Sequence, residues 1–373
     1  MTGSPDHRSL AGEGNVRRLT LIVPGDPSQP TGGYRYDARV AAELRGLDME
    51  VNVVGLAGRF PDADEQARTA LDTALCALPE GHVTVIDGLA LGGLPEIAHR
   101  HAGRLILIGL VHHPLADETG MANELRQRFL HSETKALAAC RRIVTTSEFT
   151  ARRIADLGLA SSDAQRDRIR VVPPGVDTAA PREAHASSIQ RLLCVGSLVP
   201  RKGQDLLVDA LAGLGNLPWQ LELVGDPDRD PCFSKALRAS IDDHGLGDRI
   251  ALCGVQAPDT LDSTYRNADL LVIPSHYEGY GMVVTEALAR ALPMIATTGG
   301  ALTDTVPPAA ALRVPPGDSG VLAEALRRWF GDPELRAEKQ ACAARIRSSL
   351  ADWTTTGHRF ADALNFDIEA PAT

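Results

Sequence analysis

The residues best suited to chemistry lie between Pro274 and Pro293, where two glutamates flank a glycine-rich turn. Seven residues separate Glu278 from Glu286, and Gly279 and Gly281 lie among them. Two carboxylates beside a cleft can serve as the acid and the nucleophile of a glycosidase, but that chemistry needs no Gly-Tyr-Gly segment between them. Binding of ligand hydroxyl groups explains the pattern better.

The same stretch predicts an anion site at the start of a helix. The apolar run 270–273 is typical of a buried strand, and residues 282–291 have the hydrophobic spacing of a helix. The unpaired N–H groups of a first helical turn bind anions, and Glu286 lies one turn further along. This arrangement suits a sugar nucleotide, with its diphosphate at the helix start and its ribose beside Glu286.

Two loops in the first half of the chain carry residues that suit phosphate and sugar binding. Gly32 and Gly33 follow the first predicted strand and permit a close approach of the backbone to a phosphate, although a plain turn would use the same residues. His112 and His113 end a later apolar run, and a neutral imidazole offers a donor and an acceptor to a sugar hydroxyl. Loop histidines without a role are the competing interpretation.

A loop in the second half, from Gly196 to Asp205, contains Ser197, Arg201 and Lys202. Adjacent cations at the end of a strand can neutralise the charge that a departing nucleoside diphosphate gains in the transition state. An exposed basic turn is the alternative interpretation of this loop.

The sequence does not indicate a metal site. Its six cysteines are widely scattered and several lie in apolar runs, which indicates reduced core residues. Asp117 and Glu118 follow the histidine pair without the rest of a ligand set. The triplet Asp62-Ala63-Asp64 resembles a metal-binding motif of some sugar transferases, but it begins a surface helix and is assigned to helix capping.

The elements that must position these residues alternate between apolar and amphipathic segments. In the first half the strand-like runs are 19–23, 51–54, 83–86, 105–111, 143–146 and 169–172, with helices at 35–45, 62–78, 124–139 and 148–157. After a linker at 173–190, strand-like runs resume at 192–195, 221–224, 250–253, 270–273, 294–296 and 311–314, with helices at 205–212, 234–243, 261–267, 282–291 and 319–330. This alternation predicts two parallel sheets covered by helices, with ligands at the carboxyl ends of the strands.

Composition limits the classes of protein. With 373 residues, 44% of them hydrophobic, the chain is long for one core, so two domains are expected. The net charge of -10 argues against a nucleic-acid partner. No apolar run is long enough to span a bilayer, and residues 1–15 resemble a disordered lead-in more than a signal peptide, so a cytoplasmic location is predicted. A weak peripheral membrane contact is left open by a predicted basic helix face with Arg126, Arg128, Lys135, Arg141 and Arg142.

Several short motifs follow one another along nearly the whole chain. They are Thr31-Gly32-Gly33, Thr146 to Thr150, Val171 to Asp177, Arg201-Lys202-Gly203, Leu223 to Asp226, Asn267-Ala268-Asp269, Pro274-Ser275, Glu278 to Gly281 and Glu286-Ala287-Leu288. Each motif alone is weak evidence for a family, but all of them together, in this order and spacing, are specific evidence. In this order and spacing they resemble the family-four retaining glycosyltransferases of GT-B fold.

The resemblance implies an α/β protein with two Rossmann-like domains whose parallel sheets face each other across a cleft. An acceptor domain would span residues 16–175 and a nucleotide-sugar domain 176–354, with a final helix at about 355–373 packing back on the first domain. It also implies transfer of a sugar from a nucleoside diphosphate donor to a hydroxyl acceptor with retained anomeric configuration, without a metal or another cofactor. The oligomeric state is left open.

Carried over by position, the resemblance assigns catalytic roles to Arg201, Lys202, Glu278 and one of His112 and His113. The two cations would bind the diphosphate, whereas Glu278 and the histidine would meet the donor sugar. The remaining donor-binding residues would be Gly32, Gly33, Ser197, Gly279, Tyr280, Gly281, Met282 and Glu286, the last of them on the ribose.

Two positions depart from the family pattern. Many members have an arginine where this chain has Ser197, so a second diphosphate cation is missing there and Arg201 would have to replace it. Many have glycine in place of Ala291, a change expected to affect the end of the helix more than the chemistry. The missing cation leaves open a non-catalytic nucleotide-sugar binding protein, and the fold leaves open two other enzymes, a sugar nucleotide epimerase and a glycoside phosphorylase.

Overall fold

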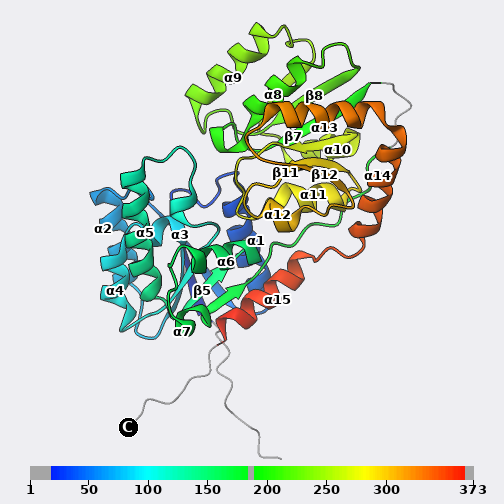
Figure 1. The fold of residues 1–373 in the computed structure, drawn as a ribbon. Helices are drawn as coiled ribbons and strands as arrows, with labels where there is room; N and C mark the ends of the chain where they lie inside the picture. Colours follow the sequence, from blue (N-terminus) through cyan, green and yellow to red (C-terminus); the bar gives the residue numbers. More distant parts are fainter. Residues whose placement is uncertain (1–17, 184–188, 366–373) are drawn as a thin grey trace, which may run out of the picture.

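The computed structural model describes residues 18–183 and 189–365. They form two α/β halves that lie one above the other in Figure 1. Each half contains one parallel sheet, as the alternating sequence pattern predicts. All twelve predicted strands are present, β1 to β6 in the first half and β7 to β12 in the second.

The first half is built on a sheet with the order β2-β1-β3-β4-β5-β6. Its strands are β1 (Arg18–Pro24), β2 (Glu50–Leu56), β3 (Val83–Asp87), β4 (Ile106–Val111), β5 (Arg142–Thr145) and β6 (Ile169–Val171). Its helical segments are α1 (Gly32–Gly46), α2 (Glu65–Cys76), α3 (Gly88–Leu91), α4 (Pro95–Ala102), the 3-10 turn η1 (Leu115–Asp117), α5 (Asn123–Ala138), α6 (Glu148–Asp156) and α7 (Asp163–Arg166). Strand β3 is wholly buried, as expected of a parallel sheet covered on both faces.

The second half repeats this design with the order β12-β11-β10-β7-β8-β9. Its strands are β7 (Gln190–Val195), β8 (Trp219–Val224), β9 (Ile250–Gly254), β10 (Leu270–Ile273), β11 (Met294–Thr297) and β12 (Ala311–Val314). Its helical segments are the 3-10 turn η2 (Pro200–Lys202), α8 (Gln204–Ala212), α9 (Pro231–Asp243), α10 (Pro258–Asn267), α11 (Met282–Ala289), α12 (Leu302–Thr305), α13 (Ser319–Gly331) and α14 (Pro333–Arg347). The central strands β10 and β11 are wholly buried.

Each sheet carries an apolar core on both faces, because successive side chains of a strand point to opposite sides. In β1, Leu21 joins one cluster and Ile22 joins the other. In β7, Leu192 and Leu193 divide in the same way. The carboxyl ends of the strands are thereby held in a fixed row along one edge of each sheet.

A last helix, α15 (Trp353–Leu364), returns the chain from the second half to the first (Figure 1). Trp353 and Phe360 pack into the same apolar cluster as Val40 and Leu44 of α1. The helix lies earlier than the range of about 355–373 predicted for it. Residues 366–373, like the lead-in predicted at 1–15, lie outside the described residues.

Helices were harder to predict than strands. The segments α3, α7 and α12 span four residues each, too few to show a helical period, and α4 and α14 were also not expected. Helix α11 ends at Ala289 and not at Ala291, because Ala291 adopts a positive φ of 55°.

The predicted basic face is divided between elements. Arg126, Arg128 and Lys135 lie on α5, whereas Arg141 lies beyond the helix and Arg142 begins β5. The prediction of one helical face was therefore wrong, and a membrane contact stays a prediction. Within the described ranges, every helix is too short or too polar to cross a bilayer.

Candidate active site

A cavity of about 470 Å³ lies between the two halves, at the carboxyl ends of their strands. The first half contributes the segment after β1 and the first turns of α1, which lie at the junction of the halves in Figure 1. The second half contributes the segments after β7, β8 and β9 and one side of α11. The predicted donor residues among its lining are Ser197, Met282 and Glu286.

Helix α11 begins with an uncapped first turn. Its N-cap, Gly281, has a φ of 86°, and no side chain caps the helix. A Cβ atom at Gly281 would lie 2.7 Å from Leu302, so this turn requires glycine. The Val284 N–H donates to the Gly281 carbonyl oxygen at 2.9 Å, so the N–H groups that precede it in the turn are the ones that can bind a ligand anion.

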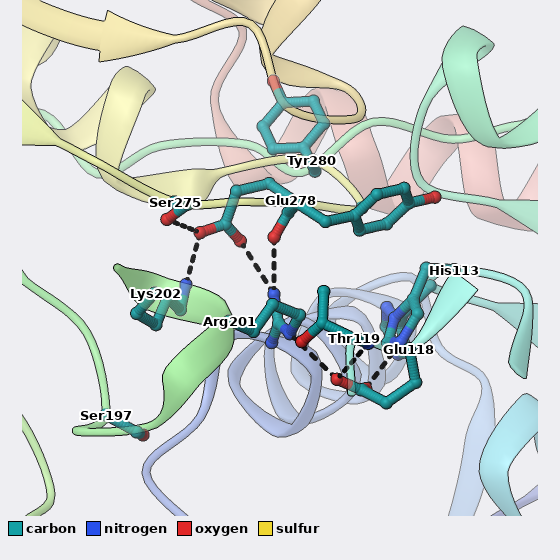
Figure 2. A network of polar contacts seen from close by, with 12 residues as sticks. His113, Glu118, Thr119, Ser197, Arg201, Lys202, Ser275, Glu278 and Tyr280 are labelled. Carbon is teal, nitrogen blue, oxygen red and sulfur yellow. Dashed lines mark hydrogen bonds and ion pairs between the residues drawn. The ribbon is translucent and has the colours of Figure 1, made fainter. Parts of the chain in front are cut away.

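Glu278 is the centre of the polar network drawn in Figure 2. It is 6% exposed, and its Oε1 atom lies 2.6 Å from Nζ of Lys202 and accepts a hydrogen bond of 2.7 Å from the Ser275 hydroxyl. Its Oε2 atom lies 3.5 Å from Nη1 of Arg201. Burial raises the pKa of this carboxyl, but Lys202 and Arg201 outweigh burial and lower it to about 2. Glu278 is therefore ionised at neutral pH.

Arg201 connects the two halves. Its Nη1 donates to the carbonyl oxygen of Tyr277 at 2.8 Å, and its Nε lies 3.5 Å from Oε1 of Glu118 in the first half. The other Glu118 oxygen lies 3.3 Å from Nε2 of His113, as Figure 2 shows. Burial raises the pKa of Glu118, but His113 and Arg201 lower it to about 2. Glu118 was not predicted as a site residue, because its partner Arg201 lies in the other half.

The loop that carries both cations is shaped by two glycines. At Gly196 an added Cβ atom would lie 3.3 Å from the stem of Lys202, so the lysine chain runs directly over this glycine. At Gly203 the φ is 66°, and an added Cβ would lie 2.4 Å from the carbonyl oxygen of Pro274. The basic loop and the loop before α11 are thus packed against each other, which brings Lys202 to Glu278.

The two histidines have different surroundings. Nε2 of His112 lies 3.1 Å from Asp37 of α1 and 3.5 Å from Asp87 at the end of β3. Burial lowers the pKa of His112, but the two carboxylates raise it above its usual value. Burial also raises the pKa of Asp87, to about 7. The His113 ring instead lies beside Tyr277, with ring centroids 6.0 Å apart. Which histidine meets the donor sugar stays a prediction.

Gly32 and Gly279 each approach a residue of the other half, whereas Gly33 lies beside His112 of its own half. A Cβ atom at Gly32 would lie 3.9 Å from Sδ of Met282, and one at Gly33 would lie 3.4 Å from the His112 ring. A Cβ atom at Gly279 would lie 2.2 Å from the carbonyl oxygen of His112. The starts of α1 and α11 therefore face each other, and a larger side chain at Gly279 would push the halves apart.

Glu286 is held from two sides. The Tyr265 hydroxyl donates to its Oε2 at 2.7 Å, and Nη1 of Arg35 on α1 lies 2.9 Å from its Oε1. Tyr280 is different, because Figure 2 shows its ring on the other side of the loop from Lys202 and Arg201. Burial raises the pKa of the Tyr280 hydroxyl to about 12. The family resemblance assigns the backbone of Tyr280, and not its ring, to donor binding.

Two groups of side chains in the described part of the chain are close enough to hold a metal ion. They are Asp37 with Asp87 and His112, and Asp72 with Cys76 and His101. The acidic triplet Asp62-Ala63-Asp64 belongs to neither group. Its Asp64 accepts a hydrogen bond from the N–H of Ala67 and caps α2, as predicted. Metal independence thus stays a prediction that requires a direct test.

Comparisons with known proteins agree with this architecture. Residues 178–345 match the family described as Glycosyl transferases group 1, and residues 89–180 match Glycosyltransferase Family 4. The chain is 36% identical to D-inositol 3-phosphate glycosyltransferase of Acidothermus cellulolyticus, over 89% of this chain and 87% of that protein.

Solved structures show the same fold at lower identity. Sucrose-phosphate synthase from Thermosynechococcus elongatus has a TM-score of 0.76 and 20% identity, over 93% of this chain and 98% of that one. Anabaena HepE in complex with UDP-glucose has a TM-score of 0.72 and 19% identity, over 93% and 99%. With its two facing parallel sheets, the chain belongs to the family-four glycosyltransferases of GT-B fold.

Proposed function

We propose that this glycosyltransferase moves a sugar from a nucleoside diphosphate to a hydroxyl acceptor, with retention of the anomeric configuration and without a metal ion. The observation that carries the proposal is the buried ion pair of Glu278 with Lys202 beside the uncapped start of α11. An ionised carboxylate accepts hydrogen bonds from sugar hydroxyls, and the lysine supplies positive charge for a phosphate.

The two halves then divide the substrates between them. Residues 176–354 would hold the donor, with the diphosphate at the start of α11 and the ribose at Glu286, and residues 16–175 would hold most of the acceptor. The cavity volume of about 470 Å³ is within the usual range for ligand sites. The complex of Anabaena HepE with UDP-glucose supports a nucleotide-sugar donor.

The transfer itself exchanges one bond at the anomeric carbon. The bond from this carbon to the diphosphate oxygen breaks, and the acceptor oxygen bonds to the same face of the sugar. The acceptor's proton passes to the departing phosphate, which therefore acts as the base. Lys202, Arg201 and the dipole of α11 stabilise the charge on the leaving group, and this route needs no covalent nucleophile from the protein.

The names of related proteins indicate which acceptors to test first. The relative from Acidothermus cellulolyticus is named for D-inositol 3-phosphate, and the Thermosynechococcus enzyme for sucrose phosphate. Both names contain a phosphorylated polyol or sugar. We therefore propose a phosphorylated polyol or sugar as the acceptor class, with D-inositol 3-phosphate as the first compound in the assay.

An NMR assay of the product tests the function. Purified protein is incubated with α-linked UDP-, GDP-, ADP- and TDP-sugars and the acceptor panel, with and without EDTA, and the anomeric signal of the product is recorded. An α-linked product that forms equally well with EDTA is expected. A β-linked product would exclude retention, a loss of activity with EDTA would exclude metal independence, and conversion of the donor without acceptor would indicate an epimerase.

Lys202→Ala should lower kcat about a hundredfold or more, because it removes a charge that acts mainly in the transition state. The matched control is Lys235→Ala, since Lys235 is exposed on α9 and does not line the cavity. Circular dichroism and melting temperature establish that both variants fold. Turnover of Lys202→Ala within a few-fold of the parent would refute the role assigned to Lys202.

A further inference from the structure

The positive charges expected for the diphosphate are already engaged by protein groups. Lys202 contacts Glu278, and Arg201 contacts Glu278, the carbonyl of Tyr277 and Glu118. Ser197 lines the cavity without a charge. A diphosphate carries two or more negative charges, so the site as predicted from the sequence is short of a free cation.

The residues that line the cavity include two arginines, Arg35 and Arg290. Arg290 is committed to its own half: it contacts Asp262 at 2.7 Å and 2.9 Å, donates to the carbonyl of Glu286 and lies over the Tyr265 ring. Among the described residues, Arg35 forms an ion pair with Glu286 alone, and its side chain is 48% exposed. Of the two, Arg35 is the one with donors to offer a ligand.

The position of Arg35 follows from how the two helix starts meet. Gly32 faces Met282, the first residue of α11, and Arg35 lies one turn further along α1. Its partner Glu286 lies one turn along α11, which corresponds to about 6 Å of helix rise from Met282. This places the ion pair of Arg35 and Glu286 within about one helical turn of the start of α11, where an anion would lie.

We propose that Arg35 supplies, from the acceptor half, the second cation of the diphosphate site. The inference rests on the proposed function. A guanidinium has five N–H donors, so the bond to Glu286 leaves others that can bind two phosphate oxygens at once. Glu286 would bind the ribose and orient Arg35 at the same time. The cation absent at Ser197 is then replaced across the cleft by Arg35, whose charge adds to that of Lys202 and Arg201.

A competing interpretation predicts an effect of opposite sign. If Arg35 only neutralises Glu286, it competes with the ribose for that carboxylate. Its removal would then leave nucleotide binding unchanged or make it tighter. If Arg35 binds the diphosphate, its removal weakens binding, and the loss depends on the number of phosphates in the ligand.

Isothermal titration calorimetry separates the two. The parent and Arg35→Gln are titrated with UDP, GDP, ADP and TDP and with the matching nucleosides. For the diphosphate that the parent binds, Arg35→Gln should raise Kd about ten- to a hundredfold, the usual effect of hydrogen bonds to charged groups. The nucleoside has no phosphate for Arg35 to bind, so its Kd should change less than about threefold. Arg35→Lys, which keeps the charge without the planar fork, should be intermediate.

Arg45→Gln is the matched control. Arg45 is exposed on the last turn of α1, donates to the carbonyl oxygen of Val51 and does not line the cavity. It should bind the diphosphate like the parent. Equal or tighter binding by Arg35→Gln, or an equal loss for nucleoside and diphosphate, overturns the inference while the proposed function stands. A parent that binds none of the four diphosphates overturns both.

Discussion

Two buried glutamates differ in charge because of their neighbours. Glu278 is 6% exposed and Glu133 is 1% exposed. Burial raises the pKa of both carboxyls, but Lys202 and Arg201 bring that of Glu278 down to about 2. At Glu133 the N–H of Leu115 offsets burial only in part, and the pKa is raised to about 8. The first residue is ionised at neutral pH and the second is protonated.

Glu133→Gln should remove a pH dependence of stability. The pKa of folded Glu133, about 8, lies above its ordinary value of 4.5, so its contribution to stability is present below pH 4.5 and is lost as the pH rises through 8. Across that window the free energy of unfolding of the parent should fall by about 1.4 kcal/mol per pH unit from this group. Urea unfolding at several pH values measures the slope, which should be smaller in the variant.

Glu124→Gln is the control for this measurement, because Glu124 lies exposed on the same helix, α5. It should keep the slope of the parent. If Glu133→Gln also kept it, the folded protein would already contain an ionised Glu133, and the assignment of a buried neutral carboxyl would be wrong.

At the scale of single residues, the sequence indicates the site residues that lie in short motifs, but not the pairs of residues that contact each other across the cleft. Lys202 and Glu278 stand out because each follows a predicted strand beside glycines. Arg35 and Glu118 do not, because their partners Glu286 and Arg201 lie in the other half. Their roles depend on tertiary contacts that no local pattern encodes.

At the scale of elements, α1 is the helix on which the site depends most. It carries Gly32 and Arg35 on its first turn, and α15 packs along it. Close packing is permitted by Gly357 of α15, where an added Cβ atom would lie 2.5 Å from Cβ of Glu43. The position of α1 beside the cavity therefore depends on a glycine near the opposite end of the chain.

Gly357→Leu should displace α1 from α15 and destabilise the protein. Overpacking of a close contact costs about 1–3 kcal/mol, and the displaced helix should also bind the nucleotide less well. Gly331→Leu is the control, because an added Cβ at this last residue of α13 would have no neighbour within 4 Å. Chemical denaturation and nucleotide titration of both variants measure the two effects. A Gly357→Leu protein as stable as the parent would show that the helices can move apart freely.

The strands were more predictable than the helices for a physical reason. Strands buried on both faces have continuous apolar sequences, which stand out between polar loops. The helix α14 was not anticipated, and α3 and α12 are shorter than the repeat that would reveal them. The end of α11 was also misplaced, because Ala291 takes the left-handed conformation that usually indicates glycine.

At the scale of the whole molecule, the two halves contact each other around the cavity and not only through the linker. The Ser147 hydroxyl donates to the carbonyl of Gly279 at 2.7 Å, and the Tyr277 hydroxyl donates to Asp117 at 3.1 Å. An ion pair joins Arg35 to Glu286. A ligand in the cavity touches both halves, so its binding is coupled to the stability of the whole fold.

A nucleoside diphosphate that binds this cavity should therefore raise the melting temperature of the chain. A ligand that binds only the folded state adds about 2.7 kcal/mol of stability at a hundredfold excess over its Kd. Differential scanning fluorimetry with UDP, GDP, ADP and TDP should single out the base that the donor carries, because we expect the base to lie against the side chains that follow β9 and line the cavity.

Variants of the second half connect this shift to the cavity. Glu286→Ala removes the carboxylate expected to bind the ribose and should reduce the rise in melting temperature. Glu324→Ala should not, because Glu324 is exposed on α13 and does not line the cavity. A full shift in Glu286→Ala would mean that the nucleotide binds elsewhere. The two halves would then contact each other for a reason other than to enclose a nucleotide.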